Sequence, residues 1–368
     1  MRIAIITTLI LGISIACKNT HSASQKGAID ADGAELAIGA GFDPSDSDLY
    51  DTDIIPAALR TELYFPLLRD AHIALVVNQS SLLGNTHLVD TLLAAGIYIE
   101  KIFAPEHGFR GTEDAGATVQ NTKDVKTGIP VMSLYGNKKK PDARDLADVD
   151  VIVFDIQDVG VRFYTYISTL HYIMEACAEN NKKCIVLDRP NPNGFYVGGP
   201  MLRSEFASFV GMDPVPVVYG MTIGEYAQML NGEKYLTGGA QCDLEVIPCA
   251  AYTHASYYEL PVAPSPNLQT MRSIYLYPSL CFFEGCNVSV GRGTDAPFEI
   301  YGSPYLPKGD FSFTPQSGPG AKSPPFMQQK CNGVDLRKKD IASIRKEGLQ
   351  LDYILDAYAR FSAEKEFF

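Results

Sequence analysis

The chain has 368 residues, of which 46% are hydrophobic and 20% are charged, and its formal net charge at pH 7 is −12. This composition is that of a globular protein rather than a disordered or fibrous one, and the length predicts two domains with buried cores. Because acidic residues outnumber basic ones, the chain offers no basic stripe to neutralise phosphates, so nucleic acid is not an expected partner.

The first 45 residues have the features of an export signal and a flexible tether. Arg2 precedes an apolar run over residues 3–15 that is too short to span a membrane, and Cys17 follows the small residue Ala16. This arrangement resembles the lipidated cysteine of bacterial lipoproteins. We therefore expect residues 1–16 to be a signal peptide and the protein to be exported to the periplasm or cell envelope, attached to the membrane through lipidated Cys17. A secreted protein with an unmodified cysteine is the alternative. Residues 17–45, rich in Ser, Ala, Gly and Asp, predict the tether.

Residues 46–214 are predicted to form a first domain of α/β class. Short apolar runs alternate with helical stretches, the pattern of parallel strands joined by crossover helices. The runs cover residues 73–77, 99–104, 131–134, 151–154 and 184–187, and the helical stretches cover 88–95, 143–147 and 166–179. This order predicts a Rossmann-like, doubly wound, mostly parallel sheet.

Polar residues follow each predicted strand. They read Asn78-Gln79-Ser80, Pro105-Glu106-His107-Gly108, Tyr135-Gly136-Asn137, Asp155-Ile156-Gln157-Asp158 and Asp188-Arg189-Pro190-Asn191. Open α/β sheets bind ligands outside the carboxyl ends of their strands, so we expect these residues to meet at one ligand site. No G-x-G-x-x-G motif opens the helix after the first strand, and neither a P-loop nor a G-x-S-x-G elbow occurs. The sequence thus predicts no nucleotide, no serine nucleophile and no cofactor.

Residues 215–368 are predicted to form a second, smaller α+β domain. The alternation of strands and helices ends there, and shorter elements are separated by Pro and Gly. Thr222 and Glu225 predict a capping box at the start of a helix.

The cysteines are open to two interpretations. In an oxidising compartment Cys177 could pair with Cys184, and Cys281 with Cys286, each pair flanking a possible turn. Most of the cysteines instead fit the pattern of small buried hydrophobic residues. No Cys/His spacing predicts zinc, so no metal site is expected.

Several long motifs resemble one bacterial family, the NamZ-type exo-β-N-acetylmuramidases of glycoside hydrolase family 171. The similarity covers roughly residue 55 to the end. The motifs are Pro105-Glu106-His107-Gly108-Phe109-Arg110-Gly111, residues 154–166, Asp188-Arg189-Pro190-Asn191-Pro192, residues 219–225, Ser265-Pro266-Asn267-Leu268, Tyr277-Pro278-Ser279-Leu280 and Gly291-Arg292-Gly293-Thr294 with Pro297-Phe298-Glu299.

This resemblance implies an exported hydrolase that removes N-acetylmuramic acid from the non-reducing ends of peptidoglycan fragments. It also implies a Rossmann-like catalytic domain joined to an auxiliary domain, which agrees with the layout above. Family members usually continue for some tens of residues beyond the equivalent of Phe368, so the second domain is expected to be truncated at its carboxyl end.

Glycoside hydrolysis generally needs an acid to protonate the leaving oxygen and a second group that stabilises developing charge or activates water. The resemblance places the catalytic glutamate at Glu106, which also follows a predicted strand. For the second carboxylate, Asp155, Asp158, Asp188 and Glu299 remain open, with Asp155 and Asp158 nearest in the motifs. A structural role in turns or helix caps is the alternative for these aspartates.

The remaining predicted site residues would bind the sugar. An arginine fork suits the lactyl carboxylate of N-acetylmuramic acid, and the motifs offer Arg110, Arg162, Arg189 and Arg292. His107 would adjust the acid or bind a hydroxyl, and Tyr135, Tyr164 and Tyr166 would stack on sugar rings or donate hydrogen bonds. The amides and acid at the other strand ends complete the set: Asn78, Gln157, Asp188 and Asn191. His171, in an apolar helical stretch, is predicted to pack in the core.

Two other functions fit the same residues. A lipid-anchored protein could bind cell-wall sugars without hydrolysing them, and a metal-dependent hydrolase could use His107 with Asp155 and Asp158. The first needs no catalytic acid. The second would be sensitive to chelators.

Overall fold

The computed structural model describes residues 50–106, 108–109, 122–136 and 138–368. A seven-stranded sheet has the order β5-β6-β4-β1-β7-β8-β9. Its strands are β1 (Ile73–Val77), β4 (Ile99–Ala104), β5 (Thr122–Lys123), β6 (Pro130–Ser133), β7 (Val151–Asp155), β8 (Lys183–Leu187) and β9 (Asp243–Ile247). All neighbours are parallel except β5, which runs antiparallel to β6. The six parallel strands follow the Rossmann order 3-2-1-4-5-6, which confirms the predicted doubly wound α/β fold.

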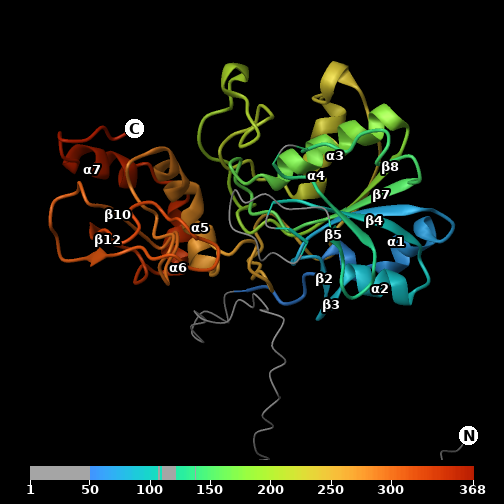
Figure 1. Cartoon of the computed structure of the whole chain (residues 1–368), viewed down its shortest axis with the longest axis horizontal. Helices are drawn as coiled ribbons and strands as arrows, with labels where there is room; N and C mark the ends of the chain where they lie inside the picture. Colours follow the sequence, from blue (N-terminus) through green and yellow to red (C-terminus); the bar gives the residue numbers. More distant parts are fainter. Residues whose placement is uncertain (1–49, 107, 110–121, 137) are drawn as a thin grey trace, which may run out of the picture. The chain divides into compact units, whose positions relative to one another are not determined.

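Helices cover both faces of this sheet (Figure 1). They are α1 (Thr61–Leu68), α2 (Leu88–Ala94), α3 (Tyr166–Asn180) and α4 (Ile223–Gly232). Alternate residues of β1 enter two separate cores: Ala74 and Val76 share one with α3 and α4, and Leu75 shares the other with α1 and α2. Because both faces are buried, a strand such as β1 is apolar throughout rather than alternating.

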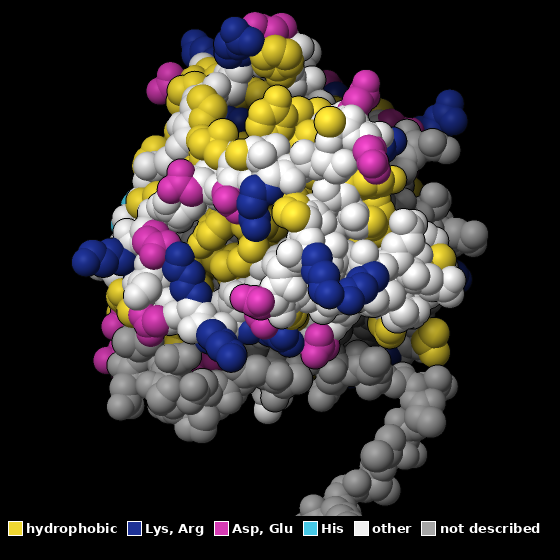
Figure 2. Space-filling model, turned by 90° about the vertical axis from the view of Figure 1, so that its left-hand side faces the viewer, with side chains coloured by type: hydrophobic (Ala, Val, Ile, Leu, Met, Phe, Trp, Pro, Cys, Tyr) yellow, Lys and Arg dark blue, Asp and Glu magenta, His cyan; other side chains and the backbone are white. Residues whose placement is uncertain are grey.

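The C-terminal segment is smaller and contains a three-stranded antiparallel sheet of order β10-β12-β11. Its elements are α5 (Met271–Leu280), β10 (Ile300–Ser303), β11 (Ser312–Phe313), β12 (Cys331–Asp335), α6 (Ile341–Glu347) and α7 (Asp352–Arg360). On the face of the molecule shown in Figure 2, both acidic and basic side chains surround exposed apolar side chains.

Short elements complete the fold. The hairpin β2 (Leu82–Leu83) and β3 (Thr86–His87) follows β1, and 3-10 turns occur at η2 (Ala57–Leu59), η3 (Ser204–Phe206), η4 (Thr237–Gly239) and η5 (Cys281–Gly285). The predicted capping box is confirmed, because Thr222 and Glu225 cap α4 reciprocally. In the described part of the chain no helix is long and apolar enough to cross a membrane.

Two features differ from the sequence-based expectations. Residues 143–147 form turns, not a helix. The side chain of Asp142 accepts hydrogen bonds from the backbone N–H groups of Arg144 and Asp145, which competes with helical bonding. The sheet also continues past residue 214, because β9 pairs with β8. Of the two interpretations of the cysteines, the structure supports the one without disulfides: the seven described cysteines are free, so neither Cys177–Cys184 nor Cys281–Cys286 is bridged.

Candidate active site

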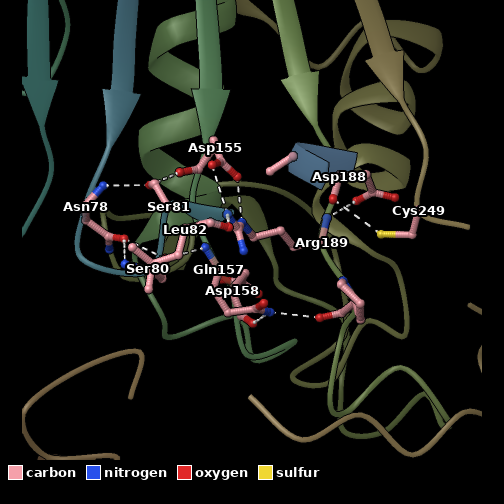
Figure 3. A network of polar contacts seen from close by, with 12 residues as sticks. Asn78, Ser80, Ser81, Leu82, Asp155, Gln157, Asp158, Asp188, Arg189 and Cys249 are labelled. Carbon is pink, nitrogen blue, oxygen red and sulfur yellow. Dashed lines mark hydrogen bonds and ion pairs between the residues drawn. The ribbon is translucent and has the colours of Figure 1, made fainter. Parts of the chain in front are cut away.

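The order of the sheet reverses between β1 and β7, which are neighbours. Open α/β sheets bind ligands at such a switch point, outside the carboxyl ends of the strands. The residues that follow β1, β7 and β8 gather in one polar network below the arrowheads in Figure 3. The structure thus brings together the predicted residues Asn78, Asp155, Gln157, Asp158, Asp188 and Arg189.

Glu106 lies two residues beyond the end of β4, which is the neighbour of β1. Its half-buried carboxylate accepts a hydrogen bond of 2.9 Å from the Thr165 hydroxyl. Thr165 immediately precedes α3, but its side chain makes no capping bond to that helix. The hydroxyl that would usually cap the helix therefore holds Glu106.

Tyr135, after β6, is a second hydroxyl partner of Glu106. Burial, the Glu106 charge and a hydrogen bond with Glu106 raise the pKa of Tyr135 to about 12. The phenol is consequently protonated at neutral pH and donates to the carboxylate. Two hydroxyl groups from separate elements thus fix the orientation of Glu106.

Three tyrosine rings lie beside these groups. Tyr164 contacts Tyr166 and Tyr277 edge-on, with ring centroids 4.9 and 6.0 Å apart. The Tyr164 hydroxyl donates to the carbonyl of Pro264, and Asn78 donates to the Tyr166 hydroxyl at 2.9 Å. Burial raises the pKa of both Tyr164 and Tyr166, and the charges of Glu106 and Asp158 add to this effect. Both carboxylates therefore act on the same pair of tyrosines.

Asp155 is fully buried and paired with Arg189. Arg189 donates from Nε to Oδ1 at 2.6 Å and from Nη2 to Oδ2 at 2.9 Å. Such a two-point pair satisfies both carboxylate oxygens. The Asp155 backbone carbonyl also accepts a hydrogen bond from Ser81. This ion pair joins the ends of β7 and β8. Asp155 is a ligand in the metal-dependent alternative, but both of its carboxylate oxygens are already bound by Arg189.

Asp158 is buried but only partly satisfied. Its Oδ2 accepts hydrogen bonds from the Gly160 N–H at 2.7 Å and from the Tyr219 hydroxyl. Among the described residues, its Oδ1 has no hydrogen-bond partner. Burial raises the pKa of Asp158 to about 6, although its hydrogen bonds oppose the rise. This carboxyl group can therefore change protonation state near neutral pH and retains an oxygen for a further partner.

Asp188, Asn191 and Gln157 hold the strand-end loops together. Asp188 accepts from the Thr222 hydroxyl and the Gly224 N–H, both at 2.8 Å, at the start of α4. Burial raises the pKa of Asp188 to about 6. Asn191 donates to the Met221 carbonyl, and Gln157 donates to the carbonyl of Pro190. Within the described part of the chain, Gln157 Oε1 is buried without a partner, so it retains an acceptor.

The predicted arginines differ in how firmly they are held. Arg162 is buried and donates from Nη1 to the carbonyls of Pro200 and Val215. Arg292 pairs with Glu284, and both side chains are partly exposed, at 20% and 37%. The guanidinium of Arg292 lies 5.1 Å from the centroid of the Phe298 ring, and that ring contacts Tyr277 edge-on. His107 and Arg110 lie outside the described residues.

Glu299 is engaged in the C-terminal segment. It accepts a hydrogen bond from Thr270 and lies 3.6 Å from Arg272. Thr165 and Tyr219, in contrast, are site residues that the sequence analysis did not single out. Thr165 follows Tyr164 and Tyr219 precedes Gly220, and both lie in motifs that carry the family resemblance. Their place in these motifs is the sequence feature that could have identified them.

Comparisons with known proteins indicate the family of this chain. Family models for the N-terminal and C-terminal parts of the exo-β-N-acetylmuramidase NamZ match residues 73–272 and 275–368. The peptidoglycan β-N-acetylmuramidase NamZ of Bacillus subtilis (strain 168) is 42% identical over 297 residues, covering 75% of this chain and 70% of the relative.

Crystal structures of two DUF1343 family proteins from Bacteroides fragilis NCTC 9343 are also similar. The first has a TM-score of 0.80 at 47% identity, with 86% of each chain covered. The second has a TM-score of 0.68 at 29% identity, covering 85% of this chain and 87% of the other. Because the two family models match nearly all of the sequence from residue 73 onward, the chain belongs to the family of exo-β-N-acetylmuramidase NamZ and is a glycosidase.

Proposed function

We propose that this protein is an exo-acting β-N-acetylmuramidase that releases N-acetylmuramic acid from the non-reducing ends of peptidoglycan fragments. The observation that carries the proposal is the position of Glu106, beside the switch point of the sheet and oriented by Thr165. The curated relative from Bacillus subtilis, a peptidoglycan β-N-acetylmuramidase, supports the substrate class.

Glu106 acts as the general acid that protonates the bridging oxygen of the glycosidic bond. A general acid must be held within hydrogen-bond reach of the atom it protonates. The Thr165 hydroxyl binds Oε2 of Glu106, and Tyr135 is a second donor. Together they restrict the rotation of the carboxyl group and support delivery of its proton in one direction.

Asp158 is the second carboxylate in this proposal. Asp155 is committed to Arg189, whereas Oδ1 of Asp158 has no partner among the described residues. With a pKa near 6, Asp158 is largely ionised at neutral pH, so it can stabilise positive charge that develops on the sugar or orient a water molecule.

Arg292 is the candidate partner of the lactyl carboxylate of N-acetylmuramic acid. Arg162 and Arg189 are buried and bonded inside the protein, whereas Arg292 pairs with Glu284 at a partly exposed position and lies over the ring of Phe298, which contacts Tyr277. A carboxylate on the sugar would compete with Glu284 for the same guanidinium, which binds carboxylates in a two-point manner.

We also propose export and lipid attachment through Cys17, on the basis of the N-terminal sequence. Membrane fractions of cells fed a labelled fatty acid should contain the labelled protein, and Cys17→Ala should remove both the label and the membrane association. Labelled Cys17→Ala protein would contradict the proposal.

The activity is tested by mass spectrometry of products from a disaccharide with N-acetylmuramic acid at its non-reducing end. Free N-acetylmuramic acid is the expected product, and the reversed disaccharide should remain intact. Longer fragments should lose only their terminal N-acetylmuramic acid, with or without a chelator. Calorimetric binding without cleavage after long incubation would favour the sugar-binding alternative, and inhibition by the chelator would favour the metal-dependent one.

A further inference from the structure

Three buried cysteines from separate elements converge outside the candidate active site. Cys177 lies near the end of α3, Cys184 is in β8 and Cys242 immediately precedes β9. Their Sγ atoms all lie within 4.8 Å of one another. Cys177 and Cys184 are fully buried, and Cys242 is 5% exposed.

The topology of the fold explains why these side chains meet. Cys184 pairs with Leu244 in the parallel register of β8 and β9. Side chains two residues apart in a strand point to the same face, so Cys242 projects from the same face of the sheet as Cys184. That face belongs to the core that contains α3, and Cys177 faces it from the helix.

Backbone contacts hold two of the three positions. The N–H and carbonyl of Cys242 are both bound by the side chain of Asn231, at 2.7 and 3.0 Å. The carbonyl of Cys177 accepts from the N–H groups of Asn181 and Lys182 where the chain leaves α3. The thiols are therefore presented by rigid parts of the scaffold, as preorganised ligands are.

The three thiols lie in an apolar core, where a bound cation would offset the charge of thiolate ligands. A thiolate is the form of cysteine that binds metals, and a buried anion requires a compensating charge. Cys331, by comparison, is a buried cysteine outside the group, where a single thiol simply fills the core.

We propose that Cys177, Cys184 and Cys242 form a buried three-sulfur binding site for one monovalent copper ion. Thiolates select soft ions such as Cu(I) and zinc. Structural zinc sites almost always use four protein ligands, whereas the group found among the described residues has three. Binding forms three Cu–S bonds and releases one proton to solvent from each thiol that becomes a thiolate, and neither copper nor sulfur changes its oxidation state.

The test is anaerobic titration of the reduced full-length protein with Cu(I) in the presence of bathocuproine disulfonate, a coloured competing chelator. The wild type should retain one more Cu(I) per chain than Cys242→Ser, and affinity for that ion should fall at least about tenfold in the variant. Cys331→Ser is the matched control and should bind like the wild type. Cu(I) should also raise the melting temperature of the wild type and of Cys331→Ser, but not of Cys242→Ser.

Equal Cu(I) retention by the wild type and Cys242→Ser would overturn the proposal. So would a disulfide between any two of the three cysteines, found by mass spectrometry of unreduced peptides. If circular dichroism showed Cys242→Ser to be unfolded, Cys177→Ala would take its place in the same titration.

Discussion

At the scale of single residues, the strand ends contain two kinds of buried carboxylate. Asp155 has both oxygens bound by Arg189, and Asp158 has one oxygen bound twice and the other without a partner in the described structure. A satisfied ion pair contributes to the fold, whereas an unsatisfied buried acceptor signals a place for a ligand or water. The two aspartates therefore have separate roles although they are three residues apart.

This division predicts opposite phenotypes for two conservative substitutions. Asp155→Asn should lower the free energy of unfolding by about 3 kcal/mol or more, because it leaves the buried charge of Arg189 without its partner. Asp158→Asn should not lower stability at pH 7, because an amide oxygen in place of Oδ2 still accepts from Gly160 and Tyr219 and the variant carries no buried charge. Its turnover should nevertheless fall by at least about tenfold. Urea unfolding and product release measure the two effects.

The pH dependence of the free energy of unfolding provides a further check on Asp158. The raised pKa of Asp158 means that the folded state loses stability as pH rises from the usual aspartate value through about 6. Asp158→Asn removes this loss, so its stability relative to the wild type should increase over the same interval. A constant difference between the two proteins across this interval would contradict the buried, ionising state of Asp158.

His171 has acidic contacts that its residue type and its apolar sequence neighbours do not predict. The sequence predicts simple packing, and the ring is indeed buried, but it also lies 2.9 Å from Asp213 and 3.3 Å from Glu175. Tyr226 donates to Asp213, and Lys140 pairs with Glu175. Burial lowers the pKa of His171, but the two acidic neighbours outweigh it and the pKa is raised overall.

His171 should therefore stabilise the fold most at low pH. Because the folded-state pKa exceeds the unfolded value of about 6.5, its contribution is complete below that pH and declines as pH rises through the raised pKa. The difference in unfolding free energy between the wild type and His171→Gln should shrink between pH 6 and pH 9. A difference that grew with pH would show that the ring is neutral in the folded protein.

At the scale of elements, the strands were predictable and some connections were not. A strand buried on both faces is a continuous apolar run, so β1 and β4 were located to the residue. In contrast, β9 is partly exposed and contains Asp243 and Glu245, so it lacks that signal. The residues at the strand ends were equally visible, but their partners were not: the Asp155–Arg189 pair joins positions 34 apart, which only the fold brings together.

The close packing of the loops after β7 and β8 requires a glycine at position 160. Gly160 has a φ of 76°, and a Cβ at this position would overlap the side-chain amide of Asn191. Gly160→Ala should therefore destabilise the protein by about 3 kcal/mol, through combined backbone strain and overpacking. Gly84→Ala is the control, because Gly84 has a φ of 59° but open space around it, and should cost about 1 kcal/mol. Equal shifts in the melting temperature would show that the loops do not interlock.

At the scale of the whole molecule, the candidate site includes residues from both segments of the chain that the two family models match. Glu106, Asp158 and Thr165 lie within residues 73–272, and Tyr277 and Arg292 lie within residues 275–368. Tyr164 connects them, because its hydroxyl donates to Pro264 and its ring contacts Tyr277. Composition and motifs predicted the two-part organisation, whereas the contribution of the second part to the surroundings of Glu106 required the structure.

The most direct measurement is the turnover of Glu106→Gln on the disaccharide with N-acetylmuramic acid at its non-reducing end. Glutamine retains the size of the side chain and its bond from Thr165 but has no acidic proton, so turnover should fall by at least about 100-fold with unchanged thermal unfolding. Glu233→Gln, at an exposed position after α4, should match the wild type. Wild-type turnover in a folded Glu106→Gln protein would contradict the assignment of Glu106 as the acid.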